Sequence, residues 1–197
     1  LIVGLLLLAV PYIVFPLVLG LLARILPVRT VGSNELLTDE ECPAVDVVVA
    51  AYNEEKVIGQ KLETLLQSKF PLERIELLIG ADNCKDQTSS IITSYQDRFP
   101  DMNLIEFTER QGKINIVNKL VNKAKHEFIV MTDANVLFDV DTLNELVKHF
   151  KNPKIGLVDS RMEHFGLKET GISMAENGYI SNEVQTKFGE GKIWGAM

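Results

Sequence analysis

The sequence predicts an α/β protein in which helices flank a mainly parallel sheet. Short runs of apolar, often β-branched residues alternate with longer segments whose apolar residues recur every three or four positions. The segments between successive runs are long enough for the helical crossovers that parallel strands require. Polar side chains follow several of the runs, which is typical of a sheet that binds a ligand at its carboxyl edge.

The chain begins with an apolar stretch in which Arg24 is the single charge up to Leu26. This length exceeds the roughly 20 residues that a membrane helix needs, and membrane helices tolerate prolines such as Pro11 and Pro16. We therefore expect a transmembrane helix over residues 1–27, with a signal peptide or a buried core helix as alternatives. Arg24 and Arg29, towards the C-terminal side, favour a cytoplasmic location for the domain that follows.

Composition divides the rest of the chain into a polar juxtamembrane linker, residues 28–44, and an α/β domain, residues 45–197. The whole chain of 197 residues has a net charge of -7. This acidity argues against nucleic-acid binding, which relies on clustered lysine and arginine. Cys42 and Cys84 have no CxxC spacing, so neither a zinc site nor a disulfide framework is indicated, and a reducing compartment fits.

The elements of the domain follow in a regular order. Strands are predicted over residues 45–51, 75–79, 103–107, 127–131 and 155–160, and helices over residues 54–69, 88–98, 113–125 and 139–151. The first strand is almost continuously β-branched, which is typical of a strand covered on both faces. Ile58, Leu62 and Leu65 form the apolar stripe of the first helix, and Pro71 follows its end.

The later elements repeat this pattern. A polar loop over residues 81–87 precedes the second helix, for which Asp86 is the expected cap. Ile114, Val117 and Val121 lie on one stripe of the third helix, and the segment after residue 139 shows the same apolar spacing. Strands and helices that alternate in this way indicate right-handed βαβ units.

The segment from Phe128 to Asn135 is the most informative in the chain. An apolar run ends there in Asp133 and Asn135, whose carboxylate and amide oxygens suit Mg²⁺ or Mn²⁺. Such ions usually complete their shell with waters and substrate phosphates, so a phosphate-bearing substrate is expected beside Asp133. A strand followed by an Asx turn is the plainer alternative.

Polar residues also stand at the ends of the first two strands, in the sequences Ala-Tyr-Asn-Glu-Glu at 51–55 and Gly-Ala-Asp-Asn at 80–83. Any one of them has a simpler interpretation as a cap or turn, but their recurrence on one sheet edge favours a site. The sequence has neither GxGxxG after the first strand nor a P-loop. A metal at Asp133 and the cation of Lys113, at a helix start, would then neutralise a diphosphate together, unless Lys113 is an ordinary surface lysine.

Four segments in order carry a resemblance to a known family. They are Val-Val-Val-Ala-Ala-Tyr-Asn-Glu-Glu at 47–55, Gly-Ala-Asp-Asn-Cys-Lys-Asp-Gln-Thr at 80–88, Gln-Gly-Lys at 111–113 and Thr-Asp-Ala-Asn at 132–135. Together they resemble the motifs of family 2 glycosyltransferases, which have the Rossmann-like GT-A fold. The resemblance implies an enzyme that transfers a sugar from a nucleotide-diphosphate donor.

The resemblance also implies roles for single residues at the donor site. Ala51, Tyr52 and Glu54 match the family's nucleoside pocket, and Asp82 matches the aspartate that hydrogen-bonds the base. Lys113 matches the lysine near the nucleotide. These five residues are therefore the expected donor-binding residues, together with the metal-binding element.

Asp133 and Asn135 occupy the ends of the family's DxD element, which engages the metal and the donor. This implies Mn²⁺ or Mg²⁺ as cofactor. Asn135 replaces the last acid of the strict motif, and an amide oxygen brings no charge. Asp133 is therefore expected to be the dominant ligand.

The acceptor side is less complete in the sequence. The general base of inverting transfer matches no residue here, and Glu163, Glu169, Glu176 and Glu183 fit no family motif. We expect the chain to be a fragment that ends before the acceptor half, with a lipid or a polysaccharide as acceptor at a membrane. The alternatives are a membrane-tethered nucleotide-binding module without catalysis and a sugar nucleotidyltransferase, whose glycine-rich N-terminal loop with an arginine is absent from this sequence.

Overall fold

The computed structural model describes residues 10–25 and 37–160. The chain divides into two compact units, of which one spans residues 33–148 and the other comprises residues 1–32 and 149–197. In the second unit, the described start consists of a π-helical turn, η1 (Val10–Val14), and helix α2 (Phe15–Ile25). Among the helices within the described ranges, none is long and apolar enough to cross a membrane.

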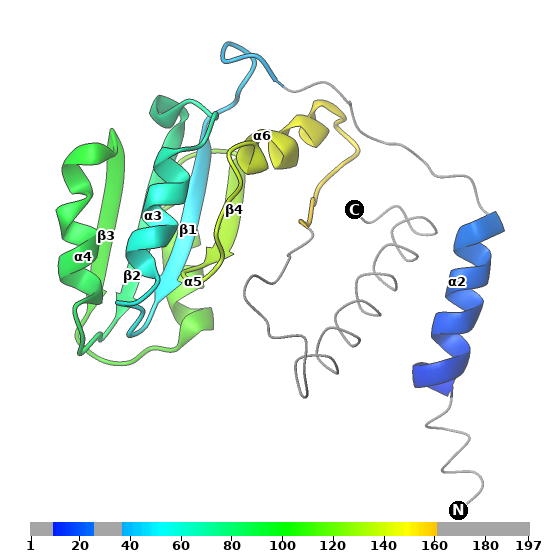
Figure 1. Ribbon diagram of the computed structural model, residues 1–197, viewed down its shortest axis with the longest axis horizontal. Helices are drawn as coiled ribbons and strands as arrows, with labels where there is room; N and C mark the ends of the chain where they lie inside the picture. The colour runs from blue at the N-terminus through cyan, green and yellow to red at the C-terminus, as the bar shows by residue number, and fades with distance from the viewer. Residues whose placement is uncertain (1–9, 26–36, 161–197) are drawn as a thin grey trace, which may run out of the picture. The chain divides into compact units, whose positions relative to one another are not determined.

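The first unit contains a sheet of four parallel strands in the order β3-β2-β1-β4 (Figure 1). The strands are β1 (Val45–Ala51), β2 (Ile75–Asp82), β3 (Asp101–Phe107) and β4 (Phe128–Asp133). The prediction of a parallel α/β domain is therefore confirmed, and these strands overlap the predicted ones closely.

Helices connect the strands as expected, but they are shorter than the sequence pattern indicates. They are α3 (Ile58–Leu66), α4 (Thr88–Ser94), α5 (Lys113–Val121) and α6 (Thr142–Val147). Short 3₁₀ turns lie at Leu72–Arg74, Gln96–Arg98 and Lys148–Lys151. Helix α3 starts at Ile58 rather than at Glu54, and the N–H groups of Glu54 and Glu55 donate to the side chains of Thr88 and Asp86.

Helices cover both faces of the sheet, and two apolar cores result (Figure 1). On one face, α3, α4 and α6 bury residues such as Ile58, Ile92 and Leu143 against the sheet. On the other face, α5 buries Ile116 and Leu120. Alternate residues of β1 enter the two cores, which explains why this strand is apolar almost throughout.

Gly80 on β2 sets how closely α5 approaches the sheet. A Cβ atom at this position would lie 2.4 Å from Cγ2 of Ile116 and 3.3 Å from Cδ1 of Leu120. Only a residue without a side chain fits such a close contact of strand and helix. The glycine therefore fixes the helix that begins with Lys113.

The predicted strand over residues 155–160 is wrong. These residues have no regular secondary structure, and Leu157 is 67% exposed. An apolar run becomes a strand only when a neighbouring strand offers its backbone groups, and within the described part of the chain no strand pairs with this segment. The candidate bases from Glu163 to Glu183 lie outside the described residues.

Candidate functional site

The strand order creates a switch point between β1 and β4. The chain proceeds from β1 outwards to β2 and β3, and then crosses through α5 to the other side of β1. Ala50 of β1 pairs in register with Asp133 of β4, so the two strands end together, while α3, which follows β1, and α5, which precedes β4, lie on opposite faces of the sheet. Ligands of open α/β sheets bind at such a point, outside the carboxyl ends of the strands.

A pocket of about 190 Å³ lies at this edge. Its lining includes every residue that the sequence singled out for the donor and the metal: Ala51, Tyr52, Glu54, Asp82, Lys113, Asp133 and Asn135. Ala50, Arg110, Ile116 and Ala134 complete it. The fold thus brings together residues that are as much as 84 positions apart in the printed sequence.

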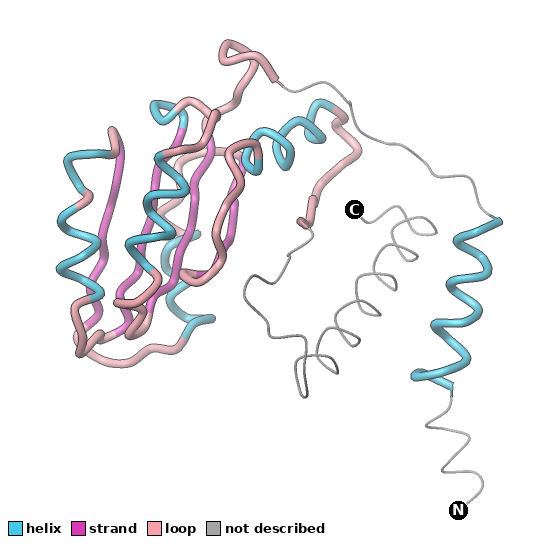
Figure 2. The backbone as a smooth tube through the Cα atoms, in the orientation of Figure 1, coloured by secondary structure: helices cyan, strands magenta, loops and turns pink. Residues whose placement is uncertain are grey.

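The loops after β1 and β2 hold each other in place at this edge (Figure 2). Asn53 and Asn83 both have left-handed backbone conformations, with φ of 54° and 53°. The Asn53 carboxamide accepts the N–H of Lys85 at 2.9 Å. Asp86, the expected cap, accepts the N–H of Thr88, the first residue of α4, at 3.0 Å. The bond between Asn53 and Lys85 therefore joins the loops that follow β1 and β2.

Asp82 is buried and its carboxylate organises the start of α5. One oxygen accepts the N–H of Gln111 at 2.6 Å, and the other accepts the N–H of Gly112 at 2.8 Å. Gly112 has φ of 81°, a conformation that other residues rarely adopt. A carboxylate has about four acceptor positions, so these two bonds leave capacity for a further donor. The loop contact is a function of Asp82 that the sequence did not predict.

Lys113 reaches across the pocket to Asp133, the predicted metal ligand. Its ammonium lies 2.6 Å from a carboxylate oxygen of Asp133, and the two side chains are 64% and 49% exposed. The predicted partners of one diphosphate are therefore direct neighbours. Because both remain accessible, an anionic ligand can take the place of Asp133 beside the ammonium.

Two further cations belong to this region, and sequence analysis did not select them. The guanidinium of Arg110 lies 3.6 Å from the centre of the Tyr52 ring, on the pocket lining. Lys61 of α3 is fully buried beside β4. Its position on the apolar stripe with Ile58, Leu62 and Leu65 was the available signal, because a lysine at such a position must find buried partners.

Lys61 supports the segment around Asp133 and Asn135 from inside the domain. Its Nζ donates to Oγ1 of Thr132 at 2.9 Å and to the carbonyl of Val136 at 2.7 Å, and it lies 3.5 Å from the centre of the Phe138 ring. Burial lowers the pKa of Lys61 to about 7, and the negative charge of Asp133 opposes this shift. Lys61 thus contacts Thr132 and Val136, the residues immediately before and after the segment 133–135.

The donor set of this element fits a hard divalent cation. Asp133 offers a half-exposed carboxylate and Asn135 an exposed amide, both on the pocket lining. Mg²⁺ and Mn²⁺ accept such oxygen ligands and fill their remaining positions with water and phosphate oxygens. A site with few protein ligands and open access suits ions of this kind.

Fold and pocket together define an α/β protein with a polar pocket at the switch point of a parallel sheet. The sequence matches Glycosyl transferase family 2 over residues 46–193, and the chain belongs to this family. The resemblance seen in the four motifs is thereby confirmed.

Individual relatives support this assignment. The chain is 26% identical to beta-monoglucosyldiacylglycerol synthase of Synechocystis sp. over 161 residues, which cover 78% of this chain and 34% of that protein. It is 28% identical to poly-beta-1,6-N-acetyl-D-glucosamine synthase of Staphylococcus aureus over 120 residues, or 60% of this chain and 28% of that protein. The chain thus spans about a third of the length of these curated relatives.

A solved structure shows the same fold. The mannosyltransferase PcManGT from Pyrobaculum calidifontis, in complex with GDP-Man and Mn²⁺, matches with a TM-score of 0.64 and 28% identity. The match covers 77% of this chain and 44% of that chain. The prediction of a GT-A-type domain is therefore confirmed.

Proposed function

We propose that this chain is the donor-binding part of a glycosyltransferase that moves a sugar from a nucleotide-diphosphate donor to a lipid or polysaccharide acceptor. The observation that carries the proposal is the Lys113–Asp133 pair at the switch point, beside Asn135, in a family 2 domain. One relative is a glycolipid synthase and another a polysaccharide synthase, which supports an acceptor of one of these classes.

Different pocket residues would contact different parts of such a donor. Tyr52, with Arg110 against its ring, offers a flat surface for the nucleoside, and Asp82 accepts from an N–H of the base. The ammonium of Lys113 and the free N–H groups at the start of α5 favour the diphosphate. The donor is thereby oriented with its leaving group over the carboxyl edge of the sheet.

Asp133 and Asn135 would hold Mn²⁺ or Mg²⁺, in agreement with the Mn²⁺ of the related mannosyltransferase structure. Such an ion offsets the charge that develops on the departing diphosphate. Lys113 adds a second positive charge at the same place. An acceptor oxygen attacks the anomeric carbon, the bond to the diphosphate oxygen breaks, and an acidic residue outside the matched motifs takes the acceptor proton, as inversion requires.

The proposed place of action is the cytoplasmic side of a membrane. It rests on the apolar stretch before Arg24 and on the positions of Arg24 and Arg29 beyond it. A lipid acceptor, or a growing polysaccharide exported across the bilayer, is chemically consistent with this place.

The proposal is tested by titrating the protein with uridine- and guanosine-diphosphate sugars in the presence and absence of Mn²⁺, by calorimetry. Wild type binds one of these donors more tightly with Mn²⁺, and Asp133→Ala removes this increase. Asp141→Ala is the matched control, because Asp141 also pairs with a lysine, Lys69 at 3.0 Å, but does not line the pocket. Donor affinity that is indifferent to Mn²⁺ in wild type would contradict metal-dependent binding.

A nucleotide-binding module without catalysis is the second candidate, and a sugar nucleotidyltransferase the third. A sugar-transfer assay on the complete protein separates them, with lipid and oligosaccharide acceptors and a radiolabelled donor. Formation of a glycoside supports the transferase. Binding without turnover supports the module, and formation of a nucleotide sugar from a sugar phosphate supports the nucleotidyltransferase.

A further inference from the structure

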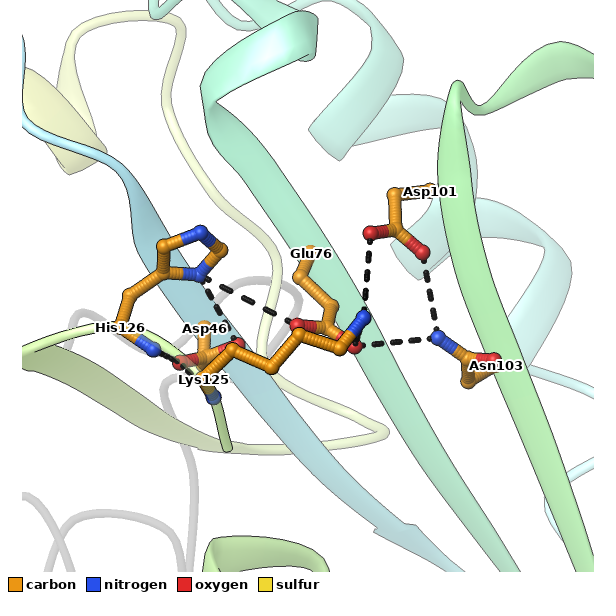
Figure 3. A network of polar contacts seen from close by, with 6 residues as sticks. All are labelled: Asp46, Glu76, Asp101, Asn103, Lys125 and His126. Atoms are coloured by element: carbon orange, nitrogen blue, oxygen red, sulfur yellow. Dashed lines mark hydrogen bonds and ion pairs between the residues drawn. The ribbon is translucent and has the colours of Figure 1, made fainter. Parts of the chain in front are cut away.

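A second group of ligand-type side chains lies at the amino-terminal edge of the sheet, away from the pocket. Asp46 of β1 and Glu76 of β2 are paired in register, and His126, two residues before the start of β4, lies beside them (Figure 3). Ala50 at the pocket lies four positions beyond Asp46 on β1, a distance of roughly 13 Å along the strand. The group is therefore separate from the donor site.

Asp46 is fully buried and firmly oriented. One carboxylate oxygen, Oδ2, accepts the N–H groups of Lys125 at 3.1 Å and of His126 at 2.6 Å. The other, Oδ1, lies 3.2 Å from Nδ1 of the His126 ring. The connection between α5 and β4 is thereby attached to β1, and Oδ1 is presented to the imidazole.

Glu76 is 2% exposed, and its two oxygens differ in their surroundings. Oε1 accepts from the ammonium of Lys125 at 2.8 Å and from the carboxamide of Asn103 at 3.1 Å (Figure 3). Oε2 is buried and has no hydrogen-bond donor among the described residues. Its distance to Nδ1 of His126 is 4.0 Å, which is too long for a hydrogen bond.

The buried, unpaired Oε2 of Glu76 is the observation that indicates a ligand at this cluster. Acidic clusters are common, but a buried carboxylate oxygen without a donor loses its hydration and gains no hydrogen bond in exchange, which is unfavourable. A single proton on Nδ1 of His126 can serve Asp46 and leaves Oε2 of Glu76 without a donor. A cation between the three side chains would serve both carboxylates at once.

The geometry suits a small divalent ion. Asp46, Glu76 and His126 each offer one ligand atom, and these three atoms all lie within 4.8 Å of one another. Zn²⁺ bonds of about 2.0–2.2 Å in a tetrahedral arrangement separate ligand atoms by roughly 3.3–3.6 Å, which lies between the 3.2 and 4.0 Å observed here. Small side-chain rotations would bring the three ligand atoms to these separations.

The surroundings also meet the usual requirements of a metal site. The second oxygen of each carboxylate is hydrogen-bonded by the protein, as outer-shell contacts require. The His126 side chain is 31% exposed, which gives an entry path and room for a water as fourth ligand. Two carboxylates and a neutral imidazole balance the charge of Zn²⁺.

We propose that Asp46, Glu76 and His126 form a structural zinc site that ties β1, β2 and the start of β4 together. The imidazole ligand and the small number of protein ligands favour Zn²⁺ over Mg²⁺ or Ca²⁺, which prefer oxygen ligands in larger number. The site does not depend on the proposed transferase function, because it shares no residue with the donor pocket.

The test uses chelator-treated full chain carrying Asp133→Ala, so that the donor-side element does not contribute. Calorimetric titration with ZnCl₂ should show one site per chain, and thermal melting should show a higher Tm with Zn²⁺. His126→Gln in the same background should weaken Zn²⁺ binding about tenfold or more, since even outer-shell changes cost 10–100-fold. His149→Gln is the histidine control and should bind as its parent does.

A second measurement avoids reliance on one variant. Co²⁺ in place of Zn²⁺ gives visible absorption bands typical of four-coordinate geometry, and these bands should disappear in His126→Gln and in Glu76→Gln. Absence of stoichiometric Zn²⁺ binding by the Asp133→Ala chain overturns the proposal and leaves a histidine–aspartate ion pair as the explanation. Equal Zn²⁺ affinity of the His126→Gln and His149→Gln chains also overturns it.

Discussion

The two ends of the central sheet use charged residues in opposite ways. At the carboxyl end, Lys113 and Asp133 form an ion pair that is half exposed on the lining of a pocket. At the amino end, Asp46 and Glu76 are 0% and 2% exposed, and their partners come from the adjoining strands and loops. The same residue types therefore line an accessible pocket at one end and are buried with protein partners at the other.

Solvent explains the difference. An exposed ion pair contributes about 0–1 kcal/mol to stability. Replacing the contact between Lys113 and Asp133 with contacts to a ligand would therefore cost little. A buried charge that loses its partners costs about 3–5 kcal/mol, so Asp46 and Glu76 must keep theirs. The comparison predicts that substitutions at the two ends affect different properties.

The largest expected effect on stability is that of Asp46→Ala. This change leaves two N–H groups, those of Lys125 and His126, without their acceptor, and we expect a loss of about 2–5 kcal/mol in the free energy of unfolding. Urea denaturation followed by circular dichroism measures it. Asp133→Ala should stay within about 0.5 kcal/mol of wild type. Similar losses in the free energy of unfolding for both variants would contradict the predicted difference between the two ends of the sheet.

Lys61→Met should change how stability depends on pH. The pKa of Lys61 is lowered from 10.5 in the unfolded chain to about 7 in the folded one, so the unfolded chain binds more protons between these values. Wild-type stability therefore gains up to about 1.4 kcal/mol per pH unit from this group as pH rises above 7.

The Met variant keeps the apolar stem but lacks this contribution. The stability difference between wild type and Lys61→Met should shift by about 2 kcal/mol in favour of wild type from pH 7 to pH 9, in urea denaturation at both pH values. Lys69→Met, at an exposed lysine, is the control and should show no such shift. A constant difference would mean that Lys61 is charged in the folded state throughout this range.

Gly80→Ala tests whether the packing of α5 matters for the pocket. The added methyl group would lie 2.4 Å from Ile116, and overpacking of this kind costs about 1–3 kcal/mol. The displaced helix carries Lys113, so donor affinity should fall as well. Gly59→Ala is the control, because its nearest contact would be an ordinary 3.6 Å. Lost stability with unchanged donor affinity would show that the position of α5 is not critical for binding.

Lys113→Met should have the smallest effect on stability, below about 1 kcal/mol, because the ion pair that it removes is exposed. Donor affinity should nevertheless fall, since the variant lacks the charge that faces the diphosphate. Parallel urea denaturation and donor titration separate the two effects. A stability loss as large as that of Asp46→Ala would mean that the carboxyl end also serves folding.

Sequence reasoning located the strands and the pocket residues well because both depend on local pattern. The β-branched run at Val45–Ala51 and the polar residues after each strand are readable without a partner, and the parallel rule then places them at one edge. It failed for residues 155–160, where an apolar run has no strand to pair with. It also missed Lys61, because the sequence does not show which distant groups accept hydrogen bonds from this lysine. These acceptors are the Thr132 hydroxyl and the Val136 carbonyl.

The sequence by itself determined the alternation of strands and helices, the family, and the residue types at the donor pocket, since these follow from periodicity and from short motifs. Tertiary structure decided which charges face water. Asp46 and Asp133 are both aspartates of sheet strands, and nothing in their immediate sequence separates a buried structural carboxylate from a half-exposed pocket one. The energy of a charge depends on the solvent and the partners around it, and the packing of distant segments sets both.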